Sequence, residues 1–145
     1  MLPRLLPSPR LRSATPADAW DGFVETQGGR MGLDPGAPMP DVPDGQTVAD
    51  VVADLIRAHQ GEQGIDLTGY TNTQITGMSQ YNLFPNCTVL ISADIMSMLI
   101  GRPGPSPHEG FFTIMNFSRV APGTDHPRAQ EYVVPEDTEL GLVMG

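Results

Sequence analysis

Hydrophobic residues in the middle of the chain recur with a helical period. Over residues 47–60 the apolar positions lie three and four residues apart, which predicts an amphipathic helix with one packed face. Thr47 with Asp50 three residues later is typical of a capping box, and Gly61 or Gly64 is expected to end the helix. Thr71 and Gln74 repeat this capping spacing and predict one more short helical turn, which leads into the next segment.

The longest apolar stretch, residues 80–102, has a different period. From Cys87 onward it alternates between two sides, which predicts one strand running to Arg102. Pro85 fixes its own backbone and restricts Phe84, so the chain is expected to turn just before this strand. The apolar side holds Cys87, Val89, Ile91, Ala93 and Ile95, and the mixed side holds Thr88, Leu90, Ser92, Asp94 and Met96.

A second strand is predicted after a proline-rich connection. Residues 103–107 carry three prolines and cannot pair as a strand, whereas residues 110–120 alternate again, with apolar residues on both sides near the start. We therefore expect residues 87–102 and 110–120 to form an antiparallel pair across the proline-rich loop.

The first third of the chain contains much less regular pattern. A short helix is predicted within residues 15–29, with Pro16 at its first position. A surface loop is predicted over residues 28–45, because Pro and Gly dominate that segment. Residues 1–14 are basic and lack the unbroken apolar run of about 7 to 15 residues that a secretory leader needs. We expect them to be a disordered start or to lie outside the natural domain. Residues 135–145 begin like a helix that is not completed.

Composition and charge narrow the functional classes. The chain has 145 residues, of which 15 are Pro and 16 are Gly, and its formal net charge is -9. Three of its eight basic residues lie before residue 15, so the remainder carries 5 minus 17, or -12. Such a body repels nucleic acid and anionic membranes. One cysteine excludes an internal disulfide, and no apolar window approaches the roughly 20 residues needed to span a bilayer. A cytoplasmic protein is expected.

Several motifs along the strand region resemble one enzyme family. Residues 81–86 (YNLFPN), an apolar strand containing Asp94, residues 102–104 (RPG) and residues 117–120 (FSRV) agree in order and spacing with the catalytic-domain sheet of the alpha subunit of Rieske-type aromatic-ring-hydroxylating oxygenases. Residues 134–141 (VPEDTELG) are similar to the segment that leads into the C-terminal helix of that family. The resemblance covers residues 44–145.

The resemblance implies a fold and a chemistry. The fold is of the α+β class, a START/Bet v 1-like helix grip in which an antiparallel sheet packs on a helix. In complete family members the concave side of the sheet holds a mononuclear Fe(II) and an aromatic or other apolar substrate. Electrons arrive through a Rieske [2Fe-2S] cluster from a ferredoxin or reductase. For this chain the resemblance implies a partial catalytic domain over residues 44–145 and a possible homo-oligomer. The Pro- and Gly-rich composition of residues 1–43 predicts a largely irregular segment with a possible short helix.

The implied fold also predicts which side chains bind substrate. Binding pockets are mainly apolar with a few placed polar groups, so we expect the wall of the concave side to contain Tyr81, Leu83, Asn86, Leu90 and Met96. The residues alone leave open whether Asn86 caps the turn after Pro85 or lines the pocket, and its position in the family favours the pocket.

The sequence departs from the family in its metal ligands. A Rieske cluster needs two Cys and two His at short spacings, but Cys87 is the only cysteine. His59, His108 and His126 are far apart, and none belongs to an Asp-x-x-His-x4-His motif. We therefore expect this chain alone to bind no cofactor and to be inactive. It is then either a piece of a ring-hydroxylating oxygenase or a cofactor-free module that binds an apolar ligand or provides an assembly surface.

Structural roles explain several of these residues equally well. Cys87 is expected to be a small buried strand residue, and His59 a favourable partner for the dipole at the end of its helix. The methionines of the strand region are expected to fill gaps in the core, although a wall of methionines also suits an apolar ligand. They are Met78, Met96, Met98 and Met115.

Overall fold

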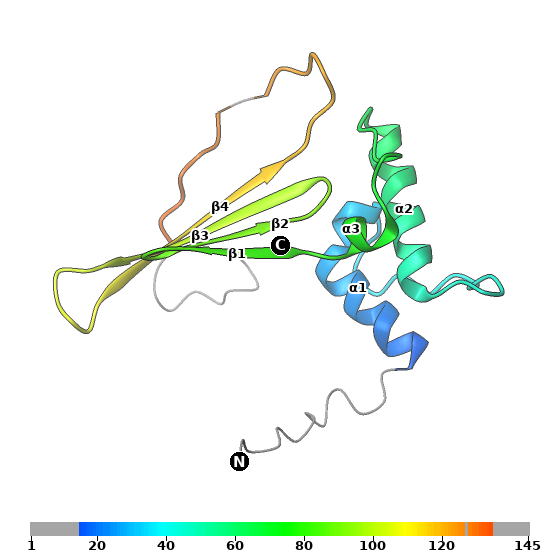
Figure 1. The fold of residues 1–145 in the computed structure, drawn as a ribbon, viewed down its shortest axis with the longest axis horizontal. Coiled ribbons are helices and arrows are strands. Elements are labelled where there is room, and N and C mark those ends of the chain that lie inside the picture. The colour runs from blue at the N-terminus through cyan, green and yellow to red at the C-terminus, as the bar shows by residue number, and fades with distance from the viewer. Residues whose placement is uncertain (1–14, 127, 135–145) are drawn as a thin grey trace.

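A computed structural model describes residues 15–126 and 128–134, so the predictions for residues 1–14 and 135–145 lie outside the described residues. Three helices come first and a four-stranded sheet follows, and the sheet projects from one end of the helical layer (Figure 1). The helices are α1 (Pro16–Met31), α2 (Val48–Glu62) and α3 (Asn72–Thr76). The strands are β1 (Ser79–Leu83), β2 (Cys87–Ile91), β3 (Ile95–Pro103) and β4 (Gly110–Ser118).

Capping boxes start all three helices. Threonine side chains at positions 15, 47 and 71 accept the backbone N–H of the third helical residue, whose own side chain accepts the backbone N–H of the threonine. The predicted helix over residues 47–60 and the predicted turn after Thr71 are confirmed. α2 continues past Gly61 to Glu62, because a single glycine weakens a helix without ending it.

α1 is longer than the sequence pattern predicted. It continues through Gly28 and Gly29 to Met31, so the prediction that a surface loop begins at Gly28 is wrong. Val24, Gly28 and Met31 share the buried face of α1, and this packing outweighs the low helix propensity of the two glycines. The helix ends at Gly32, whose φ of 69° is left-handed.

The hydrophobic core lies within the helical layer. Trp20 of α1, Ile56 of α2 and Ile75 of α3 are almost completely buried, and the Trp20 indole N–H donates to the Ala37 carbonyl oxygen at 2.7 Å. Ala93 joins this core from the connection between β2 and β3. The segment before residue 44 and the segment after it therefore contribute to one core.

The sheet is an antiparallel meander with the strand order β1-β2-β3-β4. The predicted single strand over residues 87–102 is wrong, because the chain reverses at Ser92, Ala93 and Asp94 and forms β2 and β3. Ala93 is buried in the helical core and Asp94 is held by an arginine of α1, so both leave the plane of the sheet. The predicted antiparallel pairing with residues 110–120 is confirmed between β3 and residues 110–118. β1 is a strand that the pattern did not predict.

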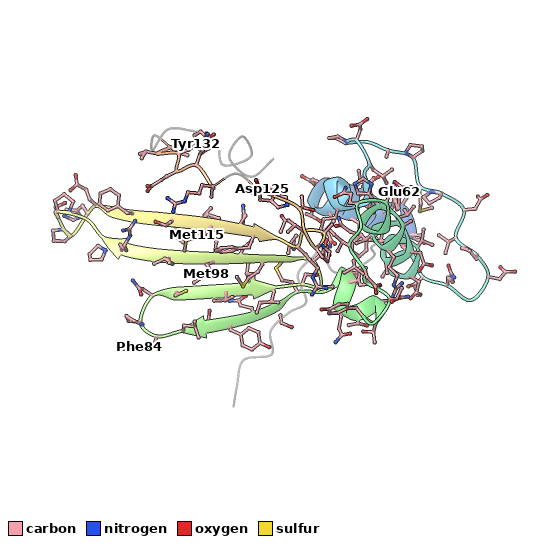
Figure 2. All side chains as sticks on the ribbon, turned by 90° about the horizontal axis from the view of Figure 1, so that it is seen from above. Glu62, Phe84, Met98, Met115, Asp125 and Tyr132 are labelled. Carbon is pink, nitrogen blue, oxygen red and sulfur yellow. The ribbon has the colours of Figure 1, made fainter. Side chains whose placement is uncertain are left out.

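The described part of the chain is thus of the α+β class with an antiparallel sheet, as predicted, but the sheet is open and does not pack on a described helix as the helix grip implies. Its three helices pack on one another and meet the sheet at one end, so neither face of the sheet is covered by a described helix (Figure 2). None of the described helices has the length and apolar character needed to cross a membrane.

Candidate apolar binding face

The strand register gathers apolar side chains on one face of the sheet. Side chains that pair directly across an antiparallel ladder share a face, and each ladder here runs without interruption. Met98 of β3 pairs with Val89 on one side and with Met115 on the other. Met98 and Met115 lie near the middle of their strands (Figure 2). We call this surface the apolar face, and it consists of Tyr81, Leu83, Cys87, Val89, Ile91, Met96, Met98, Ile100, Phe111, Met115 and Phe117.

The opposite face of the sheet is more polar. Asn82 accepts a hydrogen bond from Thr88 at 2.9 Å, and Asn116 accepts one from Ser97 at 2.7 Å. Leu90 and other apolar residues lie between these pairs. The apolar face also carries Ser79, Arg102 and Thr113, the last two joined by a hydrogen bond of 2.9 Å, but it holds fewer polar side chains than the opposite face.

Much of the apolar face is exposed to solvent. Tyr81 and Leu83 are more than half exposed, Phe111 is 60% exposed and Phe117 is 45% exposed. Each square ångström of apolar surface in water costs roughly 25 cal/mol, so an uncovered apolar sheet of this extent favours association with an apolar ligand or another apolar surface.

An open pocket of about 340 Å³ lies at the end of the apolar face nearest the helices. One of its walls comes from α3 and the residues around it, Tyr70, Thr73, Gln74 and Gly77, and the other comes from the sheet. The sheet wall contains Ser79 and Ile91, which pair with each other on the apolar face, and Ser92 of the adjoining turn. The pocket and the apolar face are therefore continuous.

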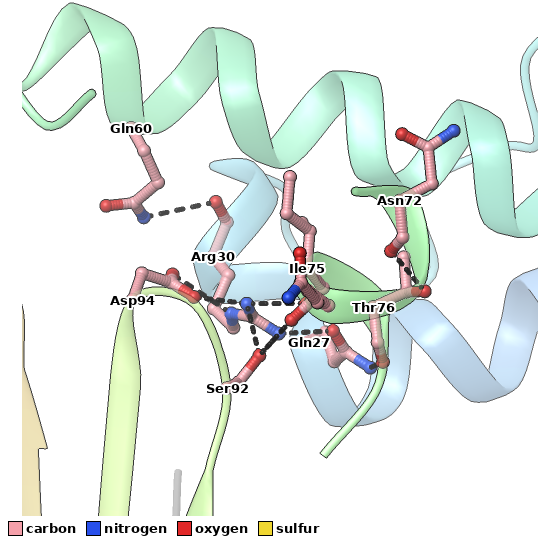
Figure 3. Close-up of polar contacts among 9 residues, drawn as sticks. Gln27, Arg30, Gln60, Asn72, Ile75, Thr76, Ser92 and Asp94 are labelled. Carbon is pink, nitrogen blue, oxygen red and sulfur yellow. Dashed lines mark hydrogen bonds and ion pairs between the residues drawn. The ribbon is translucent and has the colours of Figure 1, made fainter. Parts of the chain in front are cut away.

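A buried polar network joins the two walls behind this pocket (Figure 3). The Arg30 guanidinium of α1 forms an ion pair with Asp94, and it donates to the Ile75 carbonyl oxygen at 2.9 Å and to the Ser92 hydroxyl at 3.2 Å. The Ser92 hydroxyl in turn donates to the Ile75 carbonyl oxygen at 3.0 Å. The side chains of Arg30 and Asp94 retain only 10% and 2% of their exposure. We call Arg30, Ile75, Ser92 and Asp94 the junction network.

The predicted wall residues do not all share one face. Tyr81, Leu83 and Met96 lie on the apolar face, whereas Leu90 points to the opposite face. The turn at residues 92–94 causes this separation, because it reverses the chain and pairs Met96 with Ile91 instead of continuing the alternation from Leu90. Asn86 lies in the turn between β1 and β2, where its side-chain amide donates to the Gly101 carbonyl oxygen and its own carbonyl accepts the Gly101 N–H at 3.0 Å.

The junction network was missed from the sequence. Asp94 was visible as a charge within an apolar run, and such a charge needs a partner when it is buried. Arg30, its partner, fell in the segment that was predicted to be a loop. The two residues are 64 positions apart, so spacing alone gave no reason to pair them.

The described residues do not fit the iron centre that the resemblance implies. Such a centre needs two histidines and a carboxylate that converge. His59 lies on α2 with its Nε2 2.7 Å from the Gln63 amide nitrogen, and His108 lies in the connection between β3 and β4, at the far end of the sheet from the helices (Figure 1). Asp94 is engaged by Arg30. No group of three potential metal ligands occurs in the described part of the chain.

Fold and site together define a class of protein: an α+β chain whose antiparallel sheet has one largely apolar face, which no described helix covers, next to a small open pocket. Comparisons with family models, with curated proteins and with solved structures found no match.

Proposed function

We propose that this chain provides the substrate-binding sheet of an aromatic-ring-hydroxylating oxygenase catalytic domain with a helix-grip fold. The apolar face is the single observation that carries the proposal, because it begins at the YNLFPN motif of residues 81–86 and continues across all four strands. An aromatic hydrocarbon has no polar group to satisfy, so a wide apolar surface suits it better than a polar cleft does.

In that function, the residues of this chain bind the aromatic substrate. Tyr81 and Phe117 present aromatic rings at opposite edges of the apolar face, and methionines with adaptable side chains lie between them. Iron would supply oxygen activation in the complete protein, with electrons from a ferredoxin or reductase. No group of described residues could hold that metal, so the proposed role of this chain is limited to binding the substrate.

A second function is favoured because the candidate metal ligands already contact other side chains. His59 contacts Gln63, and Asp94 is paired with Arg30, so neither side chain is free to bind a metal without losing a contact. A cofactor-free module that binds an apolar ligand on the same face, or that uses the face for assembly, agrees with this arrangement.

Binding of naphthalene to the purified chain, measured by equilibrium dialysis, tests the role of the apolar face. Met98 and Leu99 are neighbours on β3, both half-buried, whose side chains lie on opposite faces of the sheet. We expect Met98→Gln to weaken binding about tenfold, because it places an amide on the apolar face. Leu99→Gln is the matched control and is expected to leave the affinity nearly unchanged. Equal effects of the two substitutions would contradict the proposal.

Metal analysis and oxygen uptake test what both functions share, namely that this chain by itself holds no iron centre. The chain is incubated with Fe(II) under reducing conditions, dialysed, and assayed with naphthalene and a chemical reductant. We expect less than stoichiometric iron and no substrate-dependent oxygen uptake from this chain, because converging ligands are required to hold Fe(II). Stoichiometric iron with substrate-dependent uptake would contradict both functions and show that the chain holds an iron site.

A further inference from the structure

The sheet meets the helical layer over a small area. Within the described residues no helix packs on either sheet face, and the polar contacts between the two parts concentrate at the turn between β2 and β3. The segment after β4 adds one backbone contact there, since the Arg119 N–H donates to the Asp94 carbonyl oxygen at 2.7 Å. The Arg119 guanidinium also donates to the Tyr70 hydroxyl at 2.6 Å. The orientation of the whole sheet therefore depends on what fixes this turn and on that contact.

Arg30 reaches from α1 to both sides of the junction and contacts more groups there than Ser92 or Arg119 does. Its guanidinium contacts the last turn of α3 through the Ile75 carbonyl oxygen and the turn of the sheet through Ser92 and Asp94 (Figure 3). It also donates to the side-chain oxygen of Gln27, whose amide nitrogen lies 3.3 Å from the Thr76 carbonyl oxygen. The planar fork of an arginine holds several acceptors in fixed directions, which a lysine ammonium cannot do.

The acceptors of Arg30 belong to the two walls of the open pocket. Ser92 lines the sheet wall, and Ile75 follows Gln74, which lines the helical wall. Ser92 is also 3.3 Å from the Gln74 carbonyl oxygen. A rotation of the sheet about the turn would change the separation of these walls, so the contacts that prevent the rotation also set the width of the pocket.

We propose that Arg30 is a positioning residue for ligand binding: by binding Asp94, Ser92 and the Ile75 carbonyl together, it fixes the angle between the sheet and the helical layer and holds the pocket at the width its ligand needs. This inference rests on the proposed function for the identity of the ligand, an apolar aromatic molecule. Arg30 itself lies behind the pocket and does not line it.

Two measurements on Arg30→Lys test this role. The substitution keeps the positive charge beside Asp94 and removes the fork, so we expect the Kd for naphthalene to rise about tenfold. The second readout is the distance between spin labels at Ala58→Cys on α2 and Glu109→Cys in the connection between β3 and β4, in a Cys87→Ser background. Both label positions are exposed. β3 has nine residues and extends about 30 Å, so a small rotation at the junction is amplified at its far end.

The distance distribution separates positioning from general stabilisation. We expect a narrow distribution for the unsubstituted chain and a broad one for Arg30→Lys. Arg57→Lys is the matched control, because Arg57 binds Asp54 and the Tyr70 carbonyl oxygen and its contacts stay within the helical layer. It is expected to leave the distribution narrow. Should Arg30→Lys fail to fold, Asp94→Asn removes the charge of the other partner with almost no change in shape and is measured in its place.

Each outcome bears on the inference. A broadened distribution with weakened binding supports it, and a distribution and Kd that both stay unchanged overturn it. A broadened distribution with unchanged affinity also overturns it, because the junction would then not set the binding site. If the unsubstituted chain binds no naphthalene, the proposed function fails, and the width of the distribution alone decides whether Arg30 fixes the sheet.

Discussion

Asp50 illustrates how one half-buried carboxylate can contact two helices. It closes the capping box of α2 with Thr47, and its other carboxylate oxygen accepts a hydrogen bond from the Asn72 amide at 2.6 Å. The Asn72 amide and then the Thr47 side chain and N–H stabilise the charged form, which lowers the pKa of Asp50 from 3.8 to about 2. Because the folded-state pKa lies below the unfolded value, the stability that this carboxylate contributes is present above about pH 4 and is lost as the pH falls towards 2.

The contribution of Asn72 should therefore depend on pH. We expect Asn72→Ala to lower the urea midpoint at pH 6 and to lower it by roughly half as much or less at pH 2, where Asp50 is losing its charge in the unsubstituted chain. Thr73→Ala, at an exposed position of the same short helix, is the control and should have the same small effect at both pH values. If Asn72→Ala lowers the urea midpoint by the same amount at the two pH values, this role is contradicted.

At the scale of elements, Gly29 within α1 and Gly32 just after it show how the position of a glycine decides its effect on helix stability. Gly29 is helical, with open space where a Cβ would be, whereas Gly32 ends the helix in the left-handed region. A Cβ on Gly32 would lie 2.5 Å from Nδ1 of His59 on α2. The end of α1 is thus fixed both by its backbone conformation and by the close approach of α2.

The two glycines should respond to alanine in opposite directions. We expect Gly32→Ala to destabilise the chain by about 1–2 kcal/mol or more, from the left-handed conformation and the contact with His59. Gly29→Ala should stabilise it by about 0.5–1 kcal/mol, because alanine is the better helix former. Urea unfolding at neutral pH measures both. Destabilisation by Gly29→Ala would mean that the end of α1 is not helical in solution.

At the scale of the whole molecule, burial is distributed unevenly. The helical layer contains almost all fully buried apolar residues, and within the sheet only Val89 is buried to a comparable degree. The net charge of -9 opposes association between copies, while the uncovered apolar face favours it. Salt weakens the charge repulsion between copies, and a single charge on the apolar face weakens the attraction between faces. Either change therefore shifts the equilibrium between monomer and associated chain.

We therefore expect the chain to self-associate through the apolar face at micromolar concentration, and more strongly at higher salt, where repulsion is screened. Phe117→Glu adds a charge to that face and should shift the sedimentation profile towards the monomer. Asn116→Glu adds the same charge to the opposite face one residue away and should have little effect. If both variants dissociate equally, the association depends on net charge and not on the apolar face.

The sequence by itself determined the parts of this fold that depend on local patterns. The helical period and the capping spacing located α2 and α3, and the alternation after Gly110 located β4 and its antiparallel partner. Of the five residues predicted to form one wall, Tyr81, Leu83 and Met96 share a face of the sheet, whereas Leu90 and Asn86 do not lie on it. These features are set by residues a few positions apart, so they can be read along the chain.

Only the tertiary structure decided where the alternating run of residues 87–102 breaks. Burial of Ala93 among residues of α1 and α2, and the pairing of Asp94 with Arg30, outweigh the uniform alternation and reverse the chain there. This reversal moves Leu90 and Met96 to opposite faces of the sheet and creates the junction network. The energies that select the turn come from partners up to 64 positions away, and the period of the sequence contains no information about such partners.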